Sequence, residues 1–551
     1  MNCAIYYHPE AYNTLGPKLM GRNAAGESFL RAFITYSQSN QFCVQVENLE
    51  HADDFKKKMI ELGRSESLSI IDANSLSALS EPGLVFYPGP NICEPAFHRG
   101  ILRRSDSWSL CGITHTTASA HVMDIVSNFL TSPIQPWDAL ICTSKAVKSN
   151  VELILQSQVD YLKERLGISK LVLPQLPVIP LGVHCSDFEY SLDDKEYARR
   201  KLELDSGSIV VLYLGRLSFH AKAHPLAMYK ALEDASAQTK QDIVLVECGW
   251  HSNDSIREAF SDAASMVCPS IRHIVLDGRN VESRKIAWSI ADIFCSLSDN
   301  IQETFGITPV EAMAAGIPVV VSDWDGYRDT VRDGIDGFLI PTLMPENGLG
   351  MDLALRHALR IDSYDMYCGN TSSFTSVDIK TTRNAFIKLF QSPELRRKMG
   401  EEGRKRAIEV FEWRNIIRRY EALWTSMSSL RKEESTNFKA CSYQWPSRLD
   451  PFYSFSKYPS KQLNSQIRVS LIDKDYDDAF LRFQKLYKLS MINYTKDVLP
   501  TQSEVRQILQ LATKGPQKAL DLIKSFSQSR QPFVFRGISW LLKLGILIEQ
   551  D

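Results

Sequence analysis

The sequence has no run of eighteen consecutive apolar residues, so it predicts no membrane-spanning helix. At its N-terminus no basic stretch precedes an apolar run, which argues against a secretory signal. Charge is balanced as well: 63 Lys+Arg against 65 Asp+Glu leave −2, whereas an overall nucleic-acid binder would be clearly basic. With 551 residues, of which 44% are hydrophobic, the chain is expected to form about three or four compact units.

Two further absences exclude classes of site. The eleven cysteines never occur as CxxC, which excludes a zinc ribbon or a redox pair by local spacing. An odd, scattered set is typical of reduced and mostly buried thiols, and it predicts a cytoplasmic protein. No GxGxxG follows an early strand, which excludes a NAD-dependent dehydrogenase.

Short β-branched runs alternate with helix-length segments through the first 430 residues. Runs that are apolar on both faces are typical of parallel strands buried in α/β units. Their number exceeds one open sheet, so two doubly wound domains are expected. The expected strands are 3–8, 82–88, 111–116, 138–144, 176–182, 209–215, 242–248, 271–277, 292–298 and 318–323.

Composition changes mark the domain boundaries. The sequence becomes charged and irregular at 183–205, and near 430 a long helix ends. The stretch 445–460 is rich in proline and aromatic residues, which indicates a linker, and the segments after it look helical. We therefore predict a Rossmann-like domain at 1–190, a second one at 191–430 whose last helix (405–430) packs back on the first, and a linker with a helical extension at 431–551.

The segment ETFGITPVEAMAAGIPVVVSD combines two carboxylates with a helix start. Glu303 and Glu311 are separated by seven residues, and Gly306 would let the backbone turn tightly between them. Pro309 suits the first turn of a helix, with Gly316 as its stop. Such a helix start favours anions, and the carboxylates can accept hydrogen bonds from sugar or ribose hydroxyls. The alternative is an ordinary βαβ unit.

A second motif, LGRLSFHAKAHP, places cations after a strand that ends at Gly215. Arg216 offers a planar fork and Lys222 a point charge, and together they could hold a diphosphate. The alternative is that both cations are simply solvated.

On these two motifs the sequence resembles the retaining glycosyltransferases of family 4, also known as glycosyl transferases group 1. Supporting matches are VIPLGV at 178–183, CTSKAVKSNV at 142–151 and FEWRNIIRRYEALW at 411–424. The resemblance covers about residues 1–430. It implies an α/β GT-B fold: two doubly wound Rossmann-like domains that face a cleft, here followed by a mainly helical C-terminal extension.

The resemblance also implies roles in the second domain. Arg216 and Lys222 would bind the donor diphosphate beside Gly215, and Glu311 would accept from the ribose hydroxyls. Glu303 would hold hydroxyls of the transferred sugar. The backbone of Thr304, Phe305 and Gly306 would assist it, and base recognition would fall near Gly278 and Arg279.

In the first domain the resemblance points to His115, near the sugar and the reacting centre, and to a glycine-rich loop from Gly21 to Gly26. A satisfied core histidine and a plain strand-to-helix turn are the respective alternatives. Leu181 and His184 replace the asparagine and aspartate that are frequent in the family, which would alter the hinge between the domains.

The activity implied is that of a metal-independent, retaining hexosyltransferase without a cofactor. It would move a sugar from a UDP- or GDP-sugar to a glycan or glycolipid acceptor in bacterial surface polysaccharide synthesis, by front-face attack. Asp323 and Asp325 spell a metal-binding DxD pattern, for which a loop at the mouth of the cleft is the favoured interpretation. Alternatives are a phosphorylase or epimerase of the same fold, and a non-catalytic sugar- or nucleotide-binding module.

Two basic regions bear on partners. The segment 394–424 is rich in arginine and lysine and could lie on an anionic membrane face, although interleaved glutamates also fit an ion-paired, solvated helix. The tail 441–551 has 16 Lys+Arg against 10 Asp+Glu. Its end loosely resembles a winged helix, but a helical module for partner contact, oligomerisation or stabilisation of the first domain is favoured over nucleic-acid binding. Donor sugar, base, acceptor and oligomeric state stay open.

Overall fold

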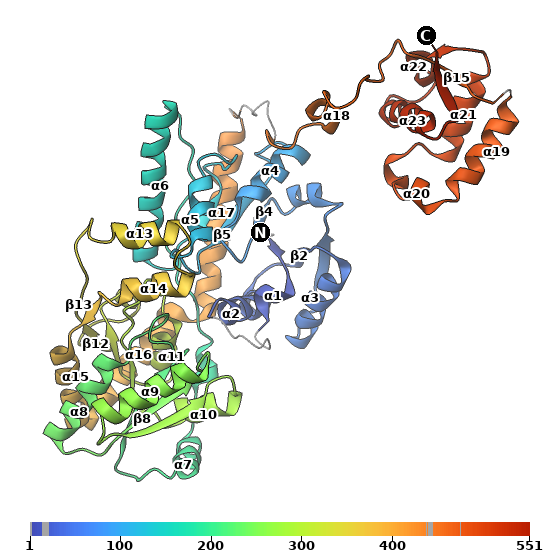
Figure 1. Ribbon diagram of the computed structural model, residues 1–551. Helices are drawn as coiled ribbons and strands as arrows, with labels where there is room; N and C mark the ends of the chain where they lie inside the picture. The colour runs from blue at the N-terminus through green and yellow to red at the C-terminus, as the bar shows by residue number, and fades with distance from the viewer. Residues whose placement is uncertain (1–2, 14–20, 437, 439–444, 474, 551) are drawn as a thin grey trace. The chain divides into compact units, whose positions relative to one another are not determined.

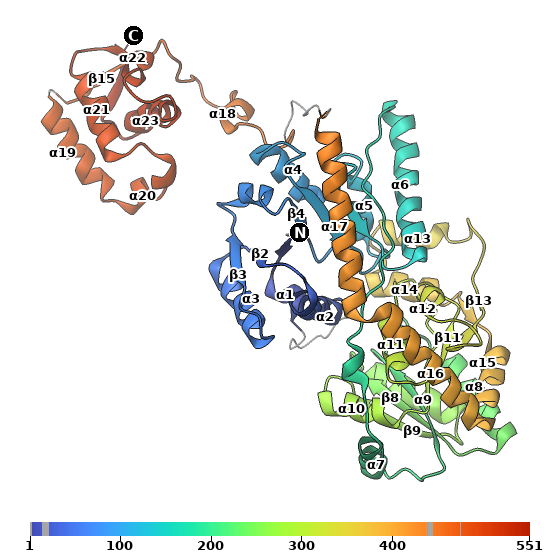
Figure 2. The ribbon, with the colours of Figure 1, turned by 180° about the vertical axis from the view of Figure 1, so that it is seen from behind.

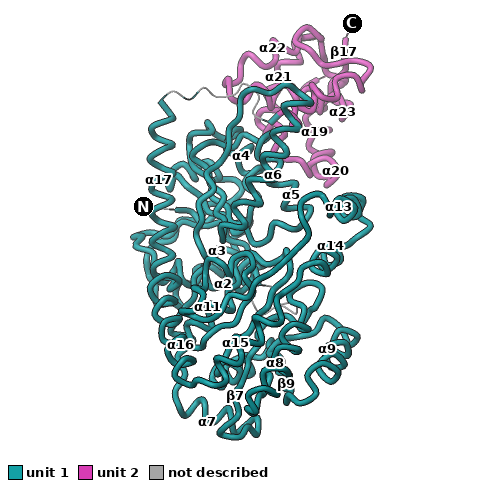
Figure 3. Tube along the Cα trace, turned by 90° about the vertical axis from the view of Figure 1, so that its left-hand side faces the viewer, with its two compact units in different colours: residues 1–445 teal, residues 446–551 magenta. Residues whose placement is uncertain are grey.

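The computed structural model describes residues 3–13, 21–436, 438, 445–473 and 475–550 (Figure 1). The chain divides into two compact units, Met1–Trp445 and Pro446–Asp551 (Figure 3). The predicted boundary at 431 lies within helix α17 (Trp413–Ser435), which continues the first unit. No helix among the described residues is long and apolar enough to cross a bilayer.

The first unit contains two six-stranded parallel sheets. One has the order β3-β2-β1-β4-β5-β6 and the other β12-β11-β10-β7-β8-β9. In each, the chain works outward from a central strand in two directions, the doubly wound arrangement expected from the alternating pattern. Strands of the first sheet are β1 (Ala4–Tyr6), β2 (Gln41–Gln45), β3 (Ser67–Ile71), β4 (Leu84–Phe86), β5 (Ser109–Ile113) and β6 (Ala139–Ile141). Strands of the second are β7 (Ile209–Leu214), β8 (Ile243–Gly249), β9 (Arg272–Asp277), β10 (Ile293–Ser296), β11 (Val319–Ser322) and β12 (Gly337–Ile340).

Helices flank both sheets (Figure 1). Around the first sheet they are α1 (Pro9–Tyr12), α2 (Gly21–Tyr36), α3 (Leu49–Glu61), α4 (Cys93–Leu102), α5 (Ala120–Asn128) and α6 (Lys145–Leu166). Around the second they include α7 (Leu192–Lys201), α8 (Leu226–Thr239), α9 (Asp254–Val267), α10 (Val281–Ile290), α11 (Ile307–Ala314), α12 (Tyr327–Thr330), α15 (Ile379–Gln391) and α16 (Pro393–Arg406). Two short helices, α13 (Met351–Ala358) and α14 (Tyr364–Ser372), lie between β12 and α15.

Two sequence expectations about the first domain are wrong. The run 176–182 is not a strand; it meets β6 through isolated bridges, such as Cys142 to Val178, because its prolines remove ladder donors. The segment Gly21–Gly26 is not a loop but the start of α2. Its Gly26 is required by close packing, since a Cβ there would lie 2.3 Å from the carbonyl oxygen of Ala11.

The basic segment 394–424 is not one helix. It comprises α16, a π-helical turn at Ala407–Phe411 and, after a break at Glu412, the start of α17. At this break the chain pairs with the earlier crossing between the domains: Val183 N donates to Phe411 O at 2.8 Å, and Trp413 N donates to Val183 O at 3.2 Å. Beyond it α17 contacts α2 and β5 of the first domain (Figure 2).

The second unit has its own hydrophobic core and more strand than expected. A three-stranded antiparallel sheet has the order β16-β15-β17, so the last strand pairs with the first. The helices and strands are α18 (Pro451–Ser454), β15 (Arg468–Leu471), α19 (Tyr476–Tyr487), α20 (Ser490–Asn493), α21 (Gln502–Ala512), β16 (Gln517–Lys518), α22 (Ala519–Ile523), α23 (Gln531–Lys543) and β17 (Leu547–Gln550). These strands have two to four residues, which is too short for a clear alternation of apolar and polar positions.

The crossing of the two chain segments generates a stability prediction. A Cβ on Gly182 would lie 2.3 to 2.8 Å from three atoms of the Trp413 indole, which is itself fully buried. Gly182→Ala therefore overpacks the crossing and should lower the free energy of unfolding by about 1–3 kcal/mol in denaturant titrations. Gly207→Ala is the matched control, because nothing lies within 4 Å of a Cβ there. Equal stability of the two variants would contradict the packing described.

Candidate functional site

The carboxyl ends of strands from both sheets meet, and the site lies at this junction. The hydroxyl of Thr304, after β10, donates to the carbonyl of His115, after β5, at 3.3 Å. Ser144, after β6, donates to Asp325, after β11, at 2.8 Å. Because ligands of open α/β sheets bind outside the carboxyl ends of the strands, this junction is the expected place for a substrate.

Lys222 and Glu303 form the central ion pair of the site. Their Nζ and Oε2 atoms lie 2.5 Å apart, and the Glu303 side chain is only 8% exposed. Burial raises the pKa of the Glu303 carboxyl, but the Lys222 charge and hydrogen bond, with the N–H groups of Thr304 and Gly306, outweigh it and hold the pKa below its usual value. Glu303 is therefore ionised at neutral pH and can accept hydrogen bonds.

Arg216 lies in the same loop as Lys222. Its guanidinium donates to the carbonyl of Ala221 at 2.7 Å and to Oε1 of Gln302 at 2.9 Å. No carboxylate neutralises it by an ion pair among the described residues. Gln302 was not predicted as a site residue, because an amide next to Glu303 matches no motif of its own. The positions of Arg216 and Lys222 thus depend on the loops after both β7 and β10.

Helix α11 begins at the turn between the two glutamates. Gly306 has φ +77°, and a Cβ there would lie 1.9 Å from the ring of Tyr327, so both the backbone and the space require glycine. Phe305 is buried behind this turn, with its backbone at the junction. Gly316 follows the helix at φ +74°, as predicted. The helix start is thus held rigidly beside the Lys222–Glu303 pair.

Glu311 lies in α11, away from the ion pair. Burial raises the pKa of its carboxyl to about 7, and the nearby Arg284 lowers it only in part. Arg284 donates to the carbonyl of Gly278 at 2.7 Å, so it links Glu311 to the end of β9. Arg284 is a further site residue that the sequence did not single out, since a lone arginine in a helix has no motif.

Glycines pack against one another where β7, β8 and β9 end. A Cβ on Gly249 would lie 2.0 Å from the carbonyl oxygen of Gly215, and Gly278 N donates to Gly249 O at 2.8 Å. The three strand ends therefore pack backbone against backbone, which a side chain at Gly249 would prevent. Arg279 instead pairs with Asp277 at 2.8 Å in an exposed position.

His115 lies across the junction from Thr304. Its Nε2 is 3.0 Å from the carbonyl oxygen of Pro88, which can only accept, so Nε2 carries the proton. Burial, with a smaller contribution from the charge of Arg22 at the start of α2, lowers the pKa of His115 to about 4. The imidazole is therefore neutral at neutral pH, and its Nδ1 is an acceptor.

Two more carboxyl groups of the junction have raised pKa values. Burial raises the pKa of Asp299, after β10, to about 7, and it does the same for Asp325. The DxD pattern does not bring its carboxylates to one place: Asp325 accepts from Ser144, whereas Asp323 pairs with Arg328 at 3.0 Å. This division favours the interpretation of 323–325 as a structural loop.

Outside this junction, one group of described side chains has the composition of a metal site. The potential ligand atoms of His8, Glu47 and His51 lie within 4.8 Å of one another; His8 follows β1, Glu47 follows β2 and His51 lies in the first turn of α3. Glu47 also accepts from the Tyr6 hydroxyl at 2.7 Å. None of the residues predicted for donor binding belongs to this group.

Comparisons with known proteins show which family and which fold the chain resembles. Residues 194–347 match the family model "Glycosyl transferases group 1". The putative glycosyltransferase EpsD of Bacillus subtilis is 22% identical over 306 residues, which are 55% of this chain and 68% of EpsD. The phosphatidyl-myo-inositol mannosyltransferase of Mycobacterium leprae is 37% identical over 136 residues, 24% of this chain and 33% of the relative. The crystal structure of Anabaena HepE in complex with UDP has a TM-score of 0.50 at 14% identity, covering 77% of this chain and all of HepE.

The matches with the mannosyltransferases span about a third of those proteins, and the likeness to HepE concerns the fold. The family match falls on the domain that contributes Arg216, Lys222, Glu303 and Glu311. Residues 194–347 thus match the glycosyl transferases group 1, and the chain has the GT-B fold.

Proposed function

We propose that this protein is a retaining, metal-independent glycosyltransferase that uses a nucleotide-diphosphate sugar, with UDP or GDP as the nucleotide. The observation that carries the proposal is the Lys222–Glu303 pair, at 2.5 Å, beside Arg216 and opposite His115. It combines cations for a diphosphate with a fixed acceptor for sugar hydroxyls in one place.

Each half of the donor has partners of matching chemistry. Arg216 and Lys222 would hold the diphosphate and stabilise its charge as it departs. Glu303, kept ionised by Lys222, would accept from hydroxyls of the sugar, and the start of α11 adds N–H donors and a positive dipole. Glu311 would accept from the ribose, with the base lying along Gly215, Gly249 and Gly278.

The chemistry proposed is front-face attack with retention at the anomeric carbon. Retention through a covalent intermediate would need a free carboxylate nucleophile, whereas Glu303 is engaged by Lys222. His115 is neutral, so it would orient a sugar hydroxyl through Nδ1 rather than donate a proton. The departing diphosphate would take the acceptor's proton, and the protein would supply position and charge stabilisation. Neither a metal nor an organic cofactor is required by this scheme.

The acceptor is proposed to be a glycan or a glycolipid in bacterial surface polysaccharide synthesis. Relatives support this class: the mycobacterial proteins are named for transfer to phosphatidyl-myo-inositol. A lipid-linked acceptor would be reached from the cytoplasmic side by peripheral contact with the membrane.

The first prediction concerns the donor. UDP or GDP should raise the melting temperature of the full chain in the presence of EDTA, because a ligand at about 100 times its Kd adds roughly 2.7 kcal/mol to stability. Lys222→Gln should abolish most of this shift, since it removes a phosphate partner. Lys230→Gln is the control, an exposed lysine paired with Asp234 on the same domain.

Three outcomes separate the alternatives. If no nucleotide raises the melting temperature of the chain, the proposal is contradicted. Nucleotide binding without transfer or hydrolysis of any nucleotide sugar would favour a non-catalytic binding module. Turnover that depends on inorganic phosphate would favour a phosphorylase.

The second prediction concerns Glu311 and pH. With a pKa of about 7, its carboxyl changes from mostly protonated at pH 6 to mostly ionised at pH 8. Only the ionised form accepts from both ribose hydroxyls, so affinity for the preferred nucleotide sugar should rise about tenfold over this range. Calorimetric titration of Glu311→Gln should give a nearly flat profile. An unchanged slope in this variant would assign the titration to Asp299 or Asp325 and refute the role of Glu311.

The third prediction concerns the reaction itself. Removal of one group that stabilises transition-state charge costs about 10²–10³ in kcat. Arg216→Gln should therefore lower kcat, measured as the rate at which nucleotide is released from the bound donor, by about this factor, with a smaller change in KM. Arg272→Gln on β9 is the matched control, because its guanidinium is engaged by the carbonyls of Leu202 and Glu203. Equal rates in the two variants would contradict the role given to Arg216.

A further inference from the structure

The arginines of the basic segment 394–424 differ in their hydrogen-bond and ion-pair partners. Five are engaged by carboxylates or backbone carbonyls, namely Arg396, Arg397, Arg404, Arg406 and Arg419. Arg414 and Arg418, four residues apart on α17, differ from them. Neither forms an ion pair with a carboxylate within the described part of the chain. Residues four apart lie on one face of a helix, so both cations point the same way.

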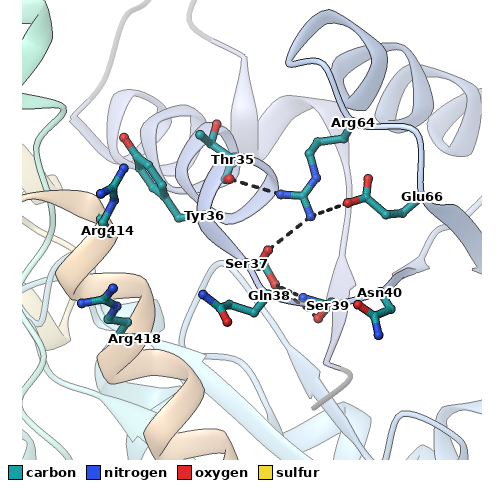
Figure 4. Close-up of a pocket in the computed structure, with 10 residues that line it drawn as sticks. All are labelled: Thr35, Tyr36, Ser37, Gln38, Ser39, Asn40, Arg64, Glu66, Arg414 and Arg418. Atoms are coloured by element: carbon teal, nitrogen blue, oxygen red, sulfur yellow. Dashed lines mark hydrogen bonds and ion pairs between the residues drawn. The ribbon is translucent and has the colours of Figure 1, made fainter.

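That face borders a cavity of about 520 Å³ (Figure 4). The cavity lies between α17, the end of α2 with the turn after it, and the segment after α3. Arg414 and Arg418 lie on one side of it, and Arg64 lies on the other with its guanidinium directed toward Ser37. A space of this size admits a small organic ligand.

The charge of the cavity lining is positive. Its single carboxylate, Glu66, pairs with Arg64 at 2.8 Å. Arg414 lies over the ring of Tyr36, at 5.3 Å from the centroid, which fixes its direction without neutralising it. Two cations are therefore left without a counter-charge in the lining. The Nε of Arg64 is also buried without a hydrogen-bond partner.

Glu421, one turn beyond Arg418, does not supply the missing counter-charge. Its carboxylate accepts from the hydroxyl of Ser37 and from the N–H of Gln38, both at 3.3 Å. It lines a neighbouring hollow rather than the cavity itself. These hydrogen bonds hold the turn after α2 in place, with the Gln38 side chain directed into the cavity (Figure 4).

We propose that this arginine pocket binds the phosphate group of a phosphorylated ligand, a phosphate monoester carried by a small molecule or by a lipid headgroup. Arginine is suited to phosphate because its planar fork donates two parallel hydrogen bonds. The pocket is separate from the donor site: it lies at the far end of α2 from Arg22, and a helix of sixteen residues spans about 24 Å. The inference does not depend on the proposed function.

The test uses the full chain and two double variants of equal charge. Arg414→Gln/Arg418→Gln removes the unpaired cations of the pocket. Lys398→Gln/Lys405→Gln removes two exposed cations of α16 that do not line it. Calorimetric titration with glycerol 3-phosphate, and sedimentation with phosphatidylcholine vesicles with and without phosphatidic acid, measure binding. Circular dichroism checks that both variants fold.

The expected result is a loss of affinity of about a hundredfold or more in the arginine double variant, about tenfold per arginine, with the lysine double variant close to the unsubstituted protein. Binding of glycerol 3-phosphate would identify a soluble ligand as the source of the phosphate. Binding only to vesicles with phosphatidic acid, lost in the arginine variant, would identify a lipid headgroup. Absence of binding to both probes, or an equal loss in the two double variants, would overturn the proposal.

Discussion

The packing of the Trp413 indole on Gly182 is the contact on which the arrangement of the two domains depends. The chain passes between the domains at 182–185 and again at 411–413, and these two passages are paired by backbone hydrogen bonds. The indole also donates to the hydroxyl of Ser28 on α2, and His184 contacts the carbonyl of the same residue. One buried cluster therefore connects both passages to the first domain.

The packing of Trp413 on Gly182 also affects the site, because α2 and α11 both start near the junction of the two sheets. With the crossing in place, the carboxyl ends of β5 and β6 face those of β10 and β11, and His115 lies next to Thr304. The charges then follow from burial. Glu303 stays ionised because Lys222 offsets its desolvation, whereas Glu311, with only Arg284 nearby, does not reach its usual pKa. Two glutamates of one motif thus have different ionisation at neutral pH.

Much of this could be predicted from the sequence. Buried strands such as 209–215 and 292–298 are apolar on both faces, and the turn at Gly306 has the residues that its φ requires. Strands β2, β3 and β12 were missed because their runs are short or interrupted by polar residues. The run 176–182 was wrongly predicted as a strand. Its apolar, β-branched composition is typical of strands, but its prolines lack the N–H groups that a ladder of hydrogen bonds needs. The need for glycine at position 26 could not be predicted either, because it comes from the close approach of Ala11, a contact that exists only in the folded chain.

The site was predictable where its residues are close in sequence and unpredictable where they come from different elements. The pairing of Lys222 with Glu303 and the proximity of Arg284 to Glu311 depend on which loops the sheet brings together. The free cations of the basic segment could not be distinguished from the paired ones either. Arg404 pairs with Glu189 and Arg419 donates to the carbonyl of Val178, both distant in sequence, whereas Arg414 and Arg418 line a cavity.

The central claim is that a nucleotide-diphosphate sugar binds at the junction of the two sheets. Amide hydrogen exchange of the full chain, with and without a saturating UDP- or GDP-sugar, tests it most directly. The account predicts slower exchange in 215–223, 278–284 and 303–311, with a smaller effect around His115, and no change in Pro446–Asp551. Protection confined to other segments, or unchanged exchange in 303–311 at saturation, would contradict it.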